Sequence, residues 1–348
     1  MSQKLSLKHN NNFNFIRTIA ALQVLVVHSF HHFELDSAFV DYIKVFPGVP
    51  IFFFLSGYLI SKSYESKEHL GIVTFFKNRI LRIFPALIVC VVVSIAAVFF
   101  TGYFSEVSFT AAKFLSWFVA QISFFQFYNV DFMRGYGVGV LNGSLWTIAV
   151  ELQFYALTPI LFYLFRKSKV FVAILLLGSL AINFYIKPGW GYNWSSMPFK
   201  LLYASSLPWF YMFVLGFLYS QYAFLREFAS KVNVFLLLGL YILSMNFVGS
   251  YEVNGSNAIN PVSVLILTVF LTKLSKVNLK LPTRIQSFLD NYDISYGMYI
   301  YHMPVINVFL YTSLFTGLSN IFLVIIITFV FAFLSWTLVE KKSLKLKT

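Results

Sequence analysis

Cysteine and charged residues are the scarcest features of this sequence. The 348 residues include one cysteine, Cys90, and charged residues make up 11% of the chain. A lone cysteine cannot form an internal disulfide, and its apolar surroundings (IVCVVVSIAAVFF) favour a small buried hydrophobic residue. With so few charges and 59% hydrophobic residues, the composition excludes an ordinary soluble domain.

The sequence is dominated by long apolar runs. They are about 16 to 23 residues long, which is the length that crosses a bilayer as an α-helix. The runs are continuous and do not alternate with polar residues, which excludes a β-barrel. The sequence therefore predicts an all-α, polytopic membrane bundle that forms a single domain over residues 1–348.

Ten membrane-spanning helices are expected, with both termini in the cytoplasm and short tails at 1–12 and 340–348. The expected spans are 13–32, 45–62, 83–101, 144–165, 169–186, 202–220, 233–249, 259–274, 295–313 and 317–339. The apolar stretch 114–128 is shorter, and counting it as a span would place Arg166, Lys167 and Lys169 outside, against the positive-inside rule. We therefore interpret 114–128 as a re-entrant or interfacial segment.

The basic residues separate by side in this topology. Five lie outside (Lys44, Lys113, Arg134, Lys187 and Lys200), and the other 21 of the 26 lysines and arginines lie inside. The net charge of +13 is thus spread over loops that face anionic membrane lipid. Because no single basic patch forms, we expect membrane lipid and no nucleic acid as a partner.

The first expected span contains Arg17 and His28. They are eleven residues apart, close to three helical turns, so both lie on one stripe with about 16 Å between them. Such groups are costly inside a membrane helix and are usually retained for a function. The alternative is that Arg17 reaches the cytoplasmic headgroups and His28 caps the other end.

A second polar pair precedes the third span. Arg79 and Arg82 share a helical face on the cytoplasmic side. Two guanidiniums suit a phosphate-rich ligand because each can donate a forked pair of hydrogen bonds. Anchoring to lipid headgroups is the alternative.

An acidic residue, Glu151, lies about two turns into the fourth span. The topology puts it at the depth of His28, where a carboxylate could orient the imidazole as a base. A structural polar pair between helices is the alternative.

The ninth span carries a further polar face. Ser295, Tyr299 and His302 stand at helical spacing, and either bind substrate or satisfy one another. In the second span, Ser56-Gly57 is interpreted as a site of close helix packing.

Five motifs occur in the order typical of the membrane acyltransferase-3 family: Arg17-x10-His28, FFFLSGYLI, Arg79-x2-Arg82 with its following proline, LWTIAVELQFY and SYGMYIYH. The chain resembles that family over roughly residues 13–340. The resemblance implies an acyltransferase of the bacterial inner membrane that moves acetyl from acetyl-CoA to a hydroxyl of a cell-surface carbohydrate or lipid-linked glycan. Some members carry a fused extracytoplasmic domain. This sequence shows none, so a stand-alone transferase is expected.

Residue roles are assigned from what the transfer of an acyl group from a thioester to an alcohol requires, which includes a grip on the donor and a base for the hydroxyl. His28 and Glu151 are expected to be catalytic, and Arg17, Arg79 and Arg82 to hold the phosphates of the donor. Its pantetheine arm would then run along the first helix toward His28. Ser295, Tyr299, His302 and Trp146 are expected to bind substrate, and no metal is expected.

A transporter is the competing class. Intramembrane histidine, glutamate and arginine suit proton coupling equally well, so a proton-coupled transporter or flippase of a lipid-linked glycan is the alternative function.

Overall fold

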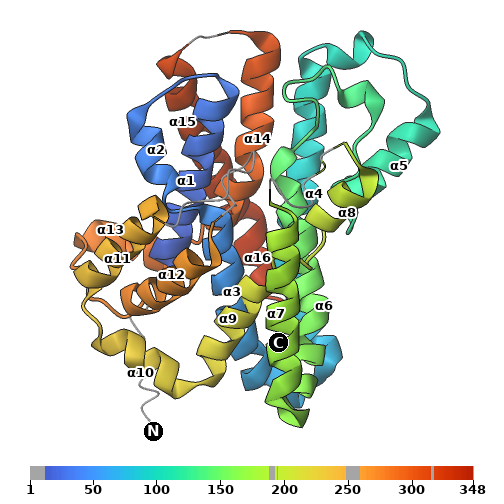
Figure 1. Ribbon diagram of the computed structural model, residues 1–348. Helices are drawn as coiled ribbons and strands as arrows, with labels where there is room; N and C mark the ends of the chain where they lie inside the picture. The colour runs from blue at the N-terminus through green and yellow to red at the C-terminus, as the bar shows by residue number, and fades with distance from the viewer. Residues whose placement is uncertain (1–11, 188–192, 194, 248–258, 315–316, 348) are drawn as a thin grey trace, which may run out of the picture.

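The chain is built from helices, and no strand element occurs among the residues that the computed structural model describes, which are 12–187, 193, 195–247, 259–314 and 317–347. Figure 1 shows the longer helices running along a common direction. The helices are α1 (Phe13–His32), α2 (Ala38–Lys44), α3 (Gly48–Lys67), α4 (Gly71–Phe100), α5 (Ala111–Gln121), α6 (Trp146–Lys167), α7 (Lys169–Tyr185), α8 (Met197–Tyr203), α9 (Phe210–Gln221), α10 (Ala223–Lys231), α11 (Val234–Phe247), α12 (Pro261–Leu274), α13 (Thr283–Asn291), α14 (Ser295–Thr312), α15 (Leu318–Ser335) and α16 (Lys341–Leu344).

Most expected spans correspond to one helix. Two expected spans differ from the helices by more than a few residues. Helix α4 begins at Gly71, well before residue 83, because the amphipathic segment FFKNRILR continues the helix beyond the apolar run. The expected span 202–220 is divided into α8 and α9 by residues 204–209. The tail 1–11 and the end of the span 233–249 lie outside the described residues.

The structure supports an integral membrane protein. Four segments are long and apolar enough to cross a bilayer: Phe13–His32, Ala38–Phe100, Gly143–Lys167 and Leu318–Leu344. A fifth results if α10 and α11, which meet at 96°, count as one span. Helices α7, α9 and α12 are apolar but shorter, and 14 residues of helix cover only about 21 Å of a hydrocarbon core of about 30 Å. The ten-span topology stays a prediction.

Helix α14 lies in the centre of the bundle. Every residue from Ser295 to Asn307 is buried, so the polar side chains of this helix face protein and not lipid. Polar groups at membrane depth are stable only when they are satisfied in this way. The polar face expected in the ninth span is therefore internal.

Helices α3 and α9 pack almost backbone to backbone. A Cβ atom on Gly57 would lie 2.0 Å from the carbonyl oxygen of Phe213, and one on Gly216 would lie 2.1 Å from that of Phe54. Any side chain at either position would force the helices apart, which explains the glycine in LSGYLI. The packing interpretation of Ser56-Gly57 therefore holds for Gly57.

The stretch 114–128 does not form a full span. It overlaps α5, whose 11 residues extend only about 16 Å, followed by turns. The side chains of Leu115, Val119, Phe124 and Phe125 are exposed. This geometry fits the interfacial or re-entrant interpretation.

Candidate active site

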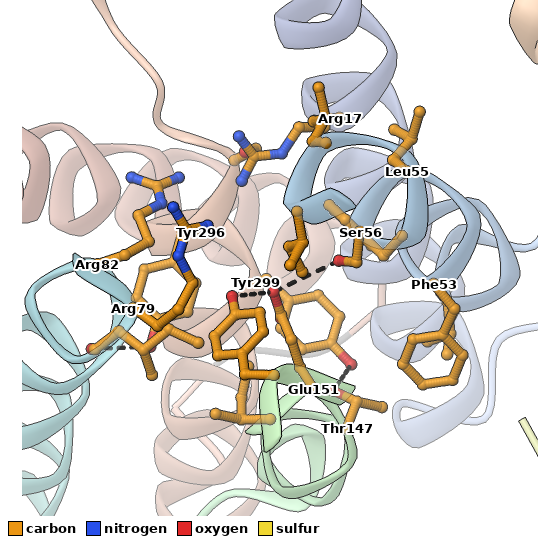
Figure 2. A pocket seen from close by; sticks show the side chains of 18 residues that line it. Arg17, Phe53, Leu55, Ser56, Arg79, Arg82, Thr147, Glu151, Tyr296 and Tyr299 are labelled. Atoms are coloured by element: carbon orange, nitrogen blue, oxygen red, sulfur yellow. Dashed lines mark hydrogen bonds between the residues drawn. The ribbon is translucent and has the colours of Figure 1, made fainter. Parts of the chain in front are cut away.

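A cavity of about 120 Å³ lies between α1, α3, α4, α6 and α14. Figure 2 shows polar side chains from all five helices converging on it. Among them are seven residues that were predicted from the sequence to be functional or to pack closely: Arg17, Ser56, Arg79, Arg82, Glu151, Ser295 and Tyr299. The fold thus brings residues of all five family motifs to one space, with an apolar wall that includes Val49, Phe53 and Ile83.

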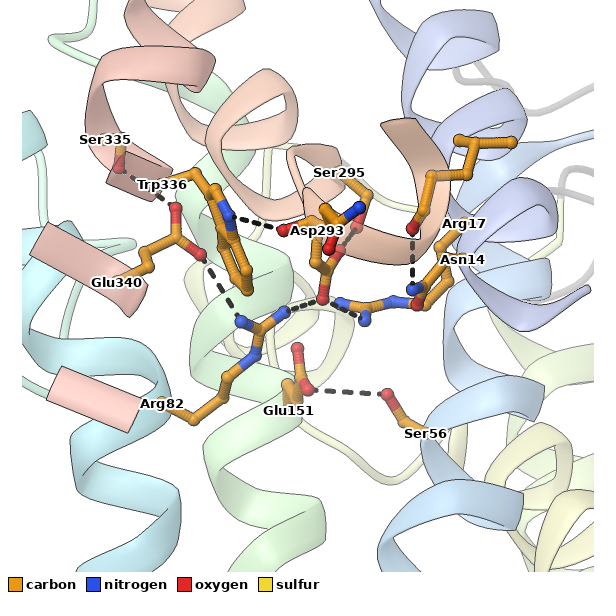
Figure 3. A network of polar contacts seen from close by, with 12 residues as sticks. Asn14, Arg17, Ser56, Arg82, Glu151, Asp293, Ser295, Ser335, Trp336 and Glu340 are labelled. Atoms are coloured by element: carbon orange, nitrogen blue, oxygen red, sulfur yellow. Dashed lines mark hydrogen bonds and ion pairs between the residues drawn. The ribbon is translucent and has the colours of Figure 1, made fainter. Parts of the chain in front are cut away.

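A buried carboxylate, Asp293, joins two of the arginines. Nη1 of Arg17 and Nη2 of Arg82 both donate to Oδ2 of Asp293, at 2.7 and 2.6 Å, and Oγ of Ser295 donates to Oδ1 at 2.7 Å. Figure 3 shows the two guanidiniums meeting on this carboxylate. Burial alone would raise the pKa of Asp293, but the charges of Arg17 and Arg82 outweigh it and hold the pKa well below its usual value.

A second acid, Glu340, pairs with the other terminal nitrogen of the Arg82 guanidinium. Nη1 of Arg82 lies 3.4 Å from Oε2 of Glu340, whose side chain is 1% exposed, and Oγ of Ser335 donates to Oε1 at 3.0 Å. Glu340 ends a π-helical turn, Trp336–Glu340, between α15 and α16. A single π-helical turn at the end of a helix often marks a functional site.

Arg79 has a different environment from the other two arginines. Its Nη2 donates to Oγ of Ser63 at 3.1 Å, its guanidinium lies over the rings of Phe75 and Tyr155, and its buried Nε has no hydrogen-bond partner. Within the described part of the chain, it is the arginine of the three that pairs with no carboxylate. Its charge is therefore available to an anionic ligand.

Further cations stand near this arginine. A smaller pocket beside the cavity is lined by Lys67, Asn78 and Arg79, together with one acid, Glu68. At the C-terminal end, Lys347 is partly buried, and this burial together with the charges of Arg79, Arg82 and Lys67 lowers its pKa to about 7. Like charges are thus concentrated at one end of the cavity.

Glu151 makes contacts that the sequence analysis did not predict. The hydroxyl of Tyr155, one turn later on α6, donates to Oε1 of Glu151 at 2.5 Å, and Oγ of Ser56 lies 3.4 Å from the same oxygen. The expected pairing of Glu151 with His28 is wrong in this structure. The two residues sit on helices that run in opposite directions, but their side chains bond to different neighbours.

His28 contacts His302 instead. Nδ1 of His28 lies 3.0 Å from Nε2 of His302, which is fully buried. Neither histidine lines the cavity, which ends at Thr147 and Tyr299. The hydroxyls of these two residues are 2.7 Å apart, and the Tyr299 ring packs between Phe52 and His302, with ring centroids 5.6 and 5.8 Å away. The expected open path from the arginines to His28 is therefore closed at Tyr299.

Two expected substrate-binding residues serve other contacts. Ser295 is bonded to Asp293, and Trp146 packs against the rings of Tyr203 and Trp209, with centroids 5.2 and 5.7 Å away, outside the cavity lining. Only Tyr299 of the expected set borders the cavity with an aromatic face. These contacts leave the substrate-binding roles as predictions.

Comparison with known proteins identifies the family. A family model described as an acyltransferase domain matches residues 10–340. The chain belongs to the acyltransferase-3 family. It is 30% identical to nodulation protein 10 of Rhizobium leguminosarum bv. viciae over 100% of this chain and 96% of that protein. It is also 29% identical to an O-acetyl transferase of Shigella phage Sf6, over 96% of each chain.

A more distant relative is the peptidoglycan O-acetyltransferase OatA of Listeria monocytogenes. The identity is 26%, over 84% of this chain and 49% of that protein. No solved structure matches.

Two acids of this acyltransferase-3 chain, Asp293 and Glu340, contact the arginines but were not predicted from the sequence. Asp293 is separated from SYGMYIYH by one residue, Ile294, and Glu340 is followed by two lysines. A usable signal was present, because the chain has only 13 acidic residues and these two border apolar segments.

Proposed function

We propose that this chain transfers an acetyl group from acetyl-CoA to a hydroxyl of a cell-surface carbohydrate, or of the lipid-linked glycan from which it is made, at the bacterial inner membrane. The observation that carries the proposal is the cavity. Three guanidiniums stand at one end, and an imidazole pair lies behind one tyrosine ring at the other. The relatives named as O-acetyl transferases support the same chemistry.

The proposed topology has ten membrane crossings and both termini in the cytoplasm, so that the arginine end of the cavity opens to the cytoplasmic pool of donor. The native cysteine, Cys90, is buried, which makes single introduced cysteines easy to label selectively. A cysteine at Lys341 should react with an impermeant thiol reagent only in inverted vesicles. Labelling in intact cells would contradict this orientation.

The donor is held from the arginine end. Arg17 and Arg82 already share Asp293, so Arg79 supplies the largest unneutralised charge for the phosphates of acetyl-CoA. A cavity of about 120 Å³ suits the narrow pantetheine arm and not the nucleotide, which would remain at the cytoplasmic mouth. The thioester then reaches Tyr299.

His28 acts as the general base. Its Nε2 removes the proton from the acceptor hydroxyl, the oxygen forms a bond to the thioester carbonyl carbon, and the carbon–sulfur bond breaks. The thiolate takes the proton back from His28 and leaves as free CoA thiol. Because the Tyr299 ring stands between the cavity and the imidazoles, it must turn aside as the thioester advances.

The test uses purified protein in liposomes with acetyl-CoA and a glycan acceptor extract, and measures free thiol together with acetylated glycan. His28→Ala should lower turnover by at least about 100-fold, the usual contribution of a general base. Arg79→Gln should raise the KM for acetyl-CoA by about tenfold or more, as expected for one lost charged hydrogen bond.

Arg284→Gln is the matched control for Arg79. Arg284 is exposed on α13 and lines neither the cavity nor the smaller pocket beside it, so the KM for acetyl-CoA of this variant should be unchanged. Movement of a glycan across the liposome membrane without loss of the thioester would instead establish the transporter alternative.

A further inference from the structure

The contact between His28 and His302 defines which ring nitrogen carries a proton. Two neutral imidazoles can share a hydrogen bond only if one nitrogen donates and the other accepts. Here the nitrogens are Nδ1 of His28 and Nε2 of His302, 3.0 Å apart. The tautomer of His28 is therefore tied to the tautomer of His302.

The surroundings of His302 favour one of the two arrangements. Its other nitrogen, Nδ1, is buried and makes no well-directed hydrogen bond within the described ranges. Met298 and Tyr299 precede His302 by four and three residues on α14, and a helical side chain leans back over that turn, so the polar groups nearest the ring are their main-chain carbonyls. Carbonyl oxygens can only accept, so a proton on Nδ1 of His302 is favoured over a bare lone pair facing them.

The consequence passes to His28. With the proton of His302 on Nδ1, its Nε2 carries a lone pair and accepts from Nδ1–H of His28. Nε2 of His28 then keeps its own lone pair, and no described residue bonds to that nitrogen. A bare Nε2 is the form of imidazole that can remove a proton.

We propose that His302 is a positioning residue that holds His28 in the Nδ1–H tautomer and so exposes Nε2 as the base. His302 thus has the role that was expected of Glu151, which is to orient the imidazole of His28. Because His302 is neutral, it adds no charge inside the membrane. When Nε2 of His28 gains the proton of the acceptor hydroxyl, the resulting positive charge is stabilised by the neutral imidazole of His302. The proton later leaves on the CoA thiol, and both rings return to their starting form. This catalytic part rests on the proposed function, whereas the tautomer itself does not.

The decisive measurement is nitrogen NMR of protein labelled with ¹⁵N-histidine in liposomes, at a pH where His28 is neutral. The chain has six histidines, and the signals of His28 are identified by their loss in His28→Gln. We expect a protonated Nδ1 and a bare Nε2. A wild-type spectrum with the proton on Nε2 overturns the proposal, whether or not the protein transfers acetyl.

Two variants at position 302 extend the test. His302→Phe keeps the ring volume but accepts no hydrogen bond, so His28 should change to the Nε2–H form that an isolated imidazole favours. His302→Gln offers an amide oxygen to Nδ1–H and should keep the wild-type tautomer. An unchanged tautomer in the Phe variant overturns the proposal.

Kinetics separate positioning from a structural role. In His302→Phe, kcat should fall at least about tenfold, the usual effect of losing the group that orients an imidazole ligand or base. The KM for acetyl-CoA should stay within about twofold, and His302→Gln should recover most of the kcat. If the Gln variant is as slow as the Phe variant while its tautomer is native, His302 does not act through His28. Complete absence of acetyl transfer in the wild type would refute the proposed function and leave the tautomer result standing.

Discussion

Removing the charge of Asp293 should strongly destabilise this fold. It accepts from Arg17 on α1 and Arg82 on α4, at 2.7 and 2.6 Å, and its side chain is 14% exposed. With an effective dielectric constant of about 20, each attraction is about 6 kcal/mol before desolvation is subtracted. Desolvation cancels much of this sum, but removing one partner of a buried pair still costs about 3–5 kcal/mol because charge is left unpaired.

The perturbation is Asp293→Asn, which keeps the size of the side chain and removes its charge. Arg17 and Arg82 would then face each other with no carboxylate between them. We expect the unfolding temperature of the purified protein to fall by roughly 5–10 °C, since about 2 °C is lost per kcal/mol in a chain of this size. Thermal unfolding in detergent, followed by tryptophan fluorescence, measures the shift.

Asp41→Asn is the matched control. Asp41 pairs with Lys44 at 3.0 Å, but both side chains are largely exposed, at 74% and 49%. Exposed ion pairs contribute at most about 1 kcal/mol, so the control should unfold within about 2 °C of the wild type. Equal unfolding temperatures for Asp293→Asn and Asp41→Asn would refute the reasoning.

The same carboxylate makes a pH prediction. The pKa of Asp293 is lower in the folded chain than its usual value of about 3.9, so its contribution is complete above that pH and is lost as the pH falls below it. The difference in unfolding temperature between the wild type and Asp293→Asn should be constant from pH 5 to 8 and should shrink below pH 4. A constant difference at pH 3 would show that the ion pairs are not its source.

Two further predictions concern packing and donor binding. Gly216→Ala places a Cβ atom 2.1 Å from the carbonyl oxygen of Phe54 and should lower the free energy of unfolding by about 1–3 kcal/mol or more. In the control Gly178→Ala, the new Cβ atom has no atom within 4 Å, so this variant should be neutral or stabilising. Equal effects of the two variants would contradict the packing of α3 on α9. Because the pKa of Lys347 is about 7, this residue is mostly charged at pH 6 and mostly neutral at pH 8, so the KM for acetyl-CoA should rise over that interval. Lys347→Arg, which stays charged, should flatten the rise; an identical pH dependence in this variant would remove Lys347 from the donor site.

Several elements of the fold follow from the sequence because they depend on local properties. The apolar run after Asn12 becomes α1 over the expected residues, since length and hydrophobicity alone select a helix in a bilayer. Arg79 and Arg82 share a face because helical spacing requires it. The closeness of Gly57 to α9 also has a local cause, since only glycine lacks the atom that would block the approach.

The partners of the polar side chains could not be obtained in the same way. Glu151 and His28 stand at comparable depth in the expected topology, yet Glu151 bonds to Tyr155 and His28 to His302. The depth of a residue in the membrane does not determine how its helix is rotated about its own axis, or which helices lie beside it. A rotation of one residue turns a side chain by about 100°, enough to exchange one neighbour for another.

The sequence by itself determined a membrane-embedded helical acyltransferase and named most of the polar side chains that line its cavity, because hydrophobic length and motif spacing are properties of short segments. Only the tertiary structure decided that Asp293 pairs with both Arg17 and Arg82 and that Tyr299 separates the cavity from the histidines. Asp293 and Arg17 are 276 residues apart along the chain. Such contacts depend on how distant helices pack, and no local pattern records that packing.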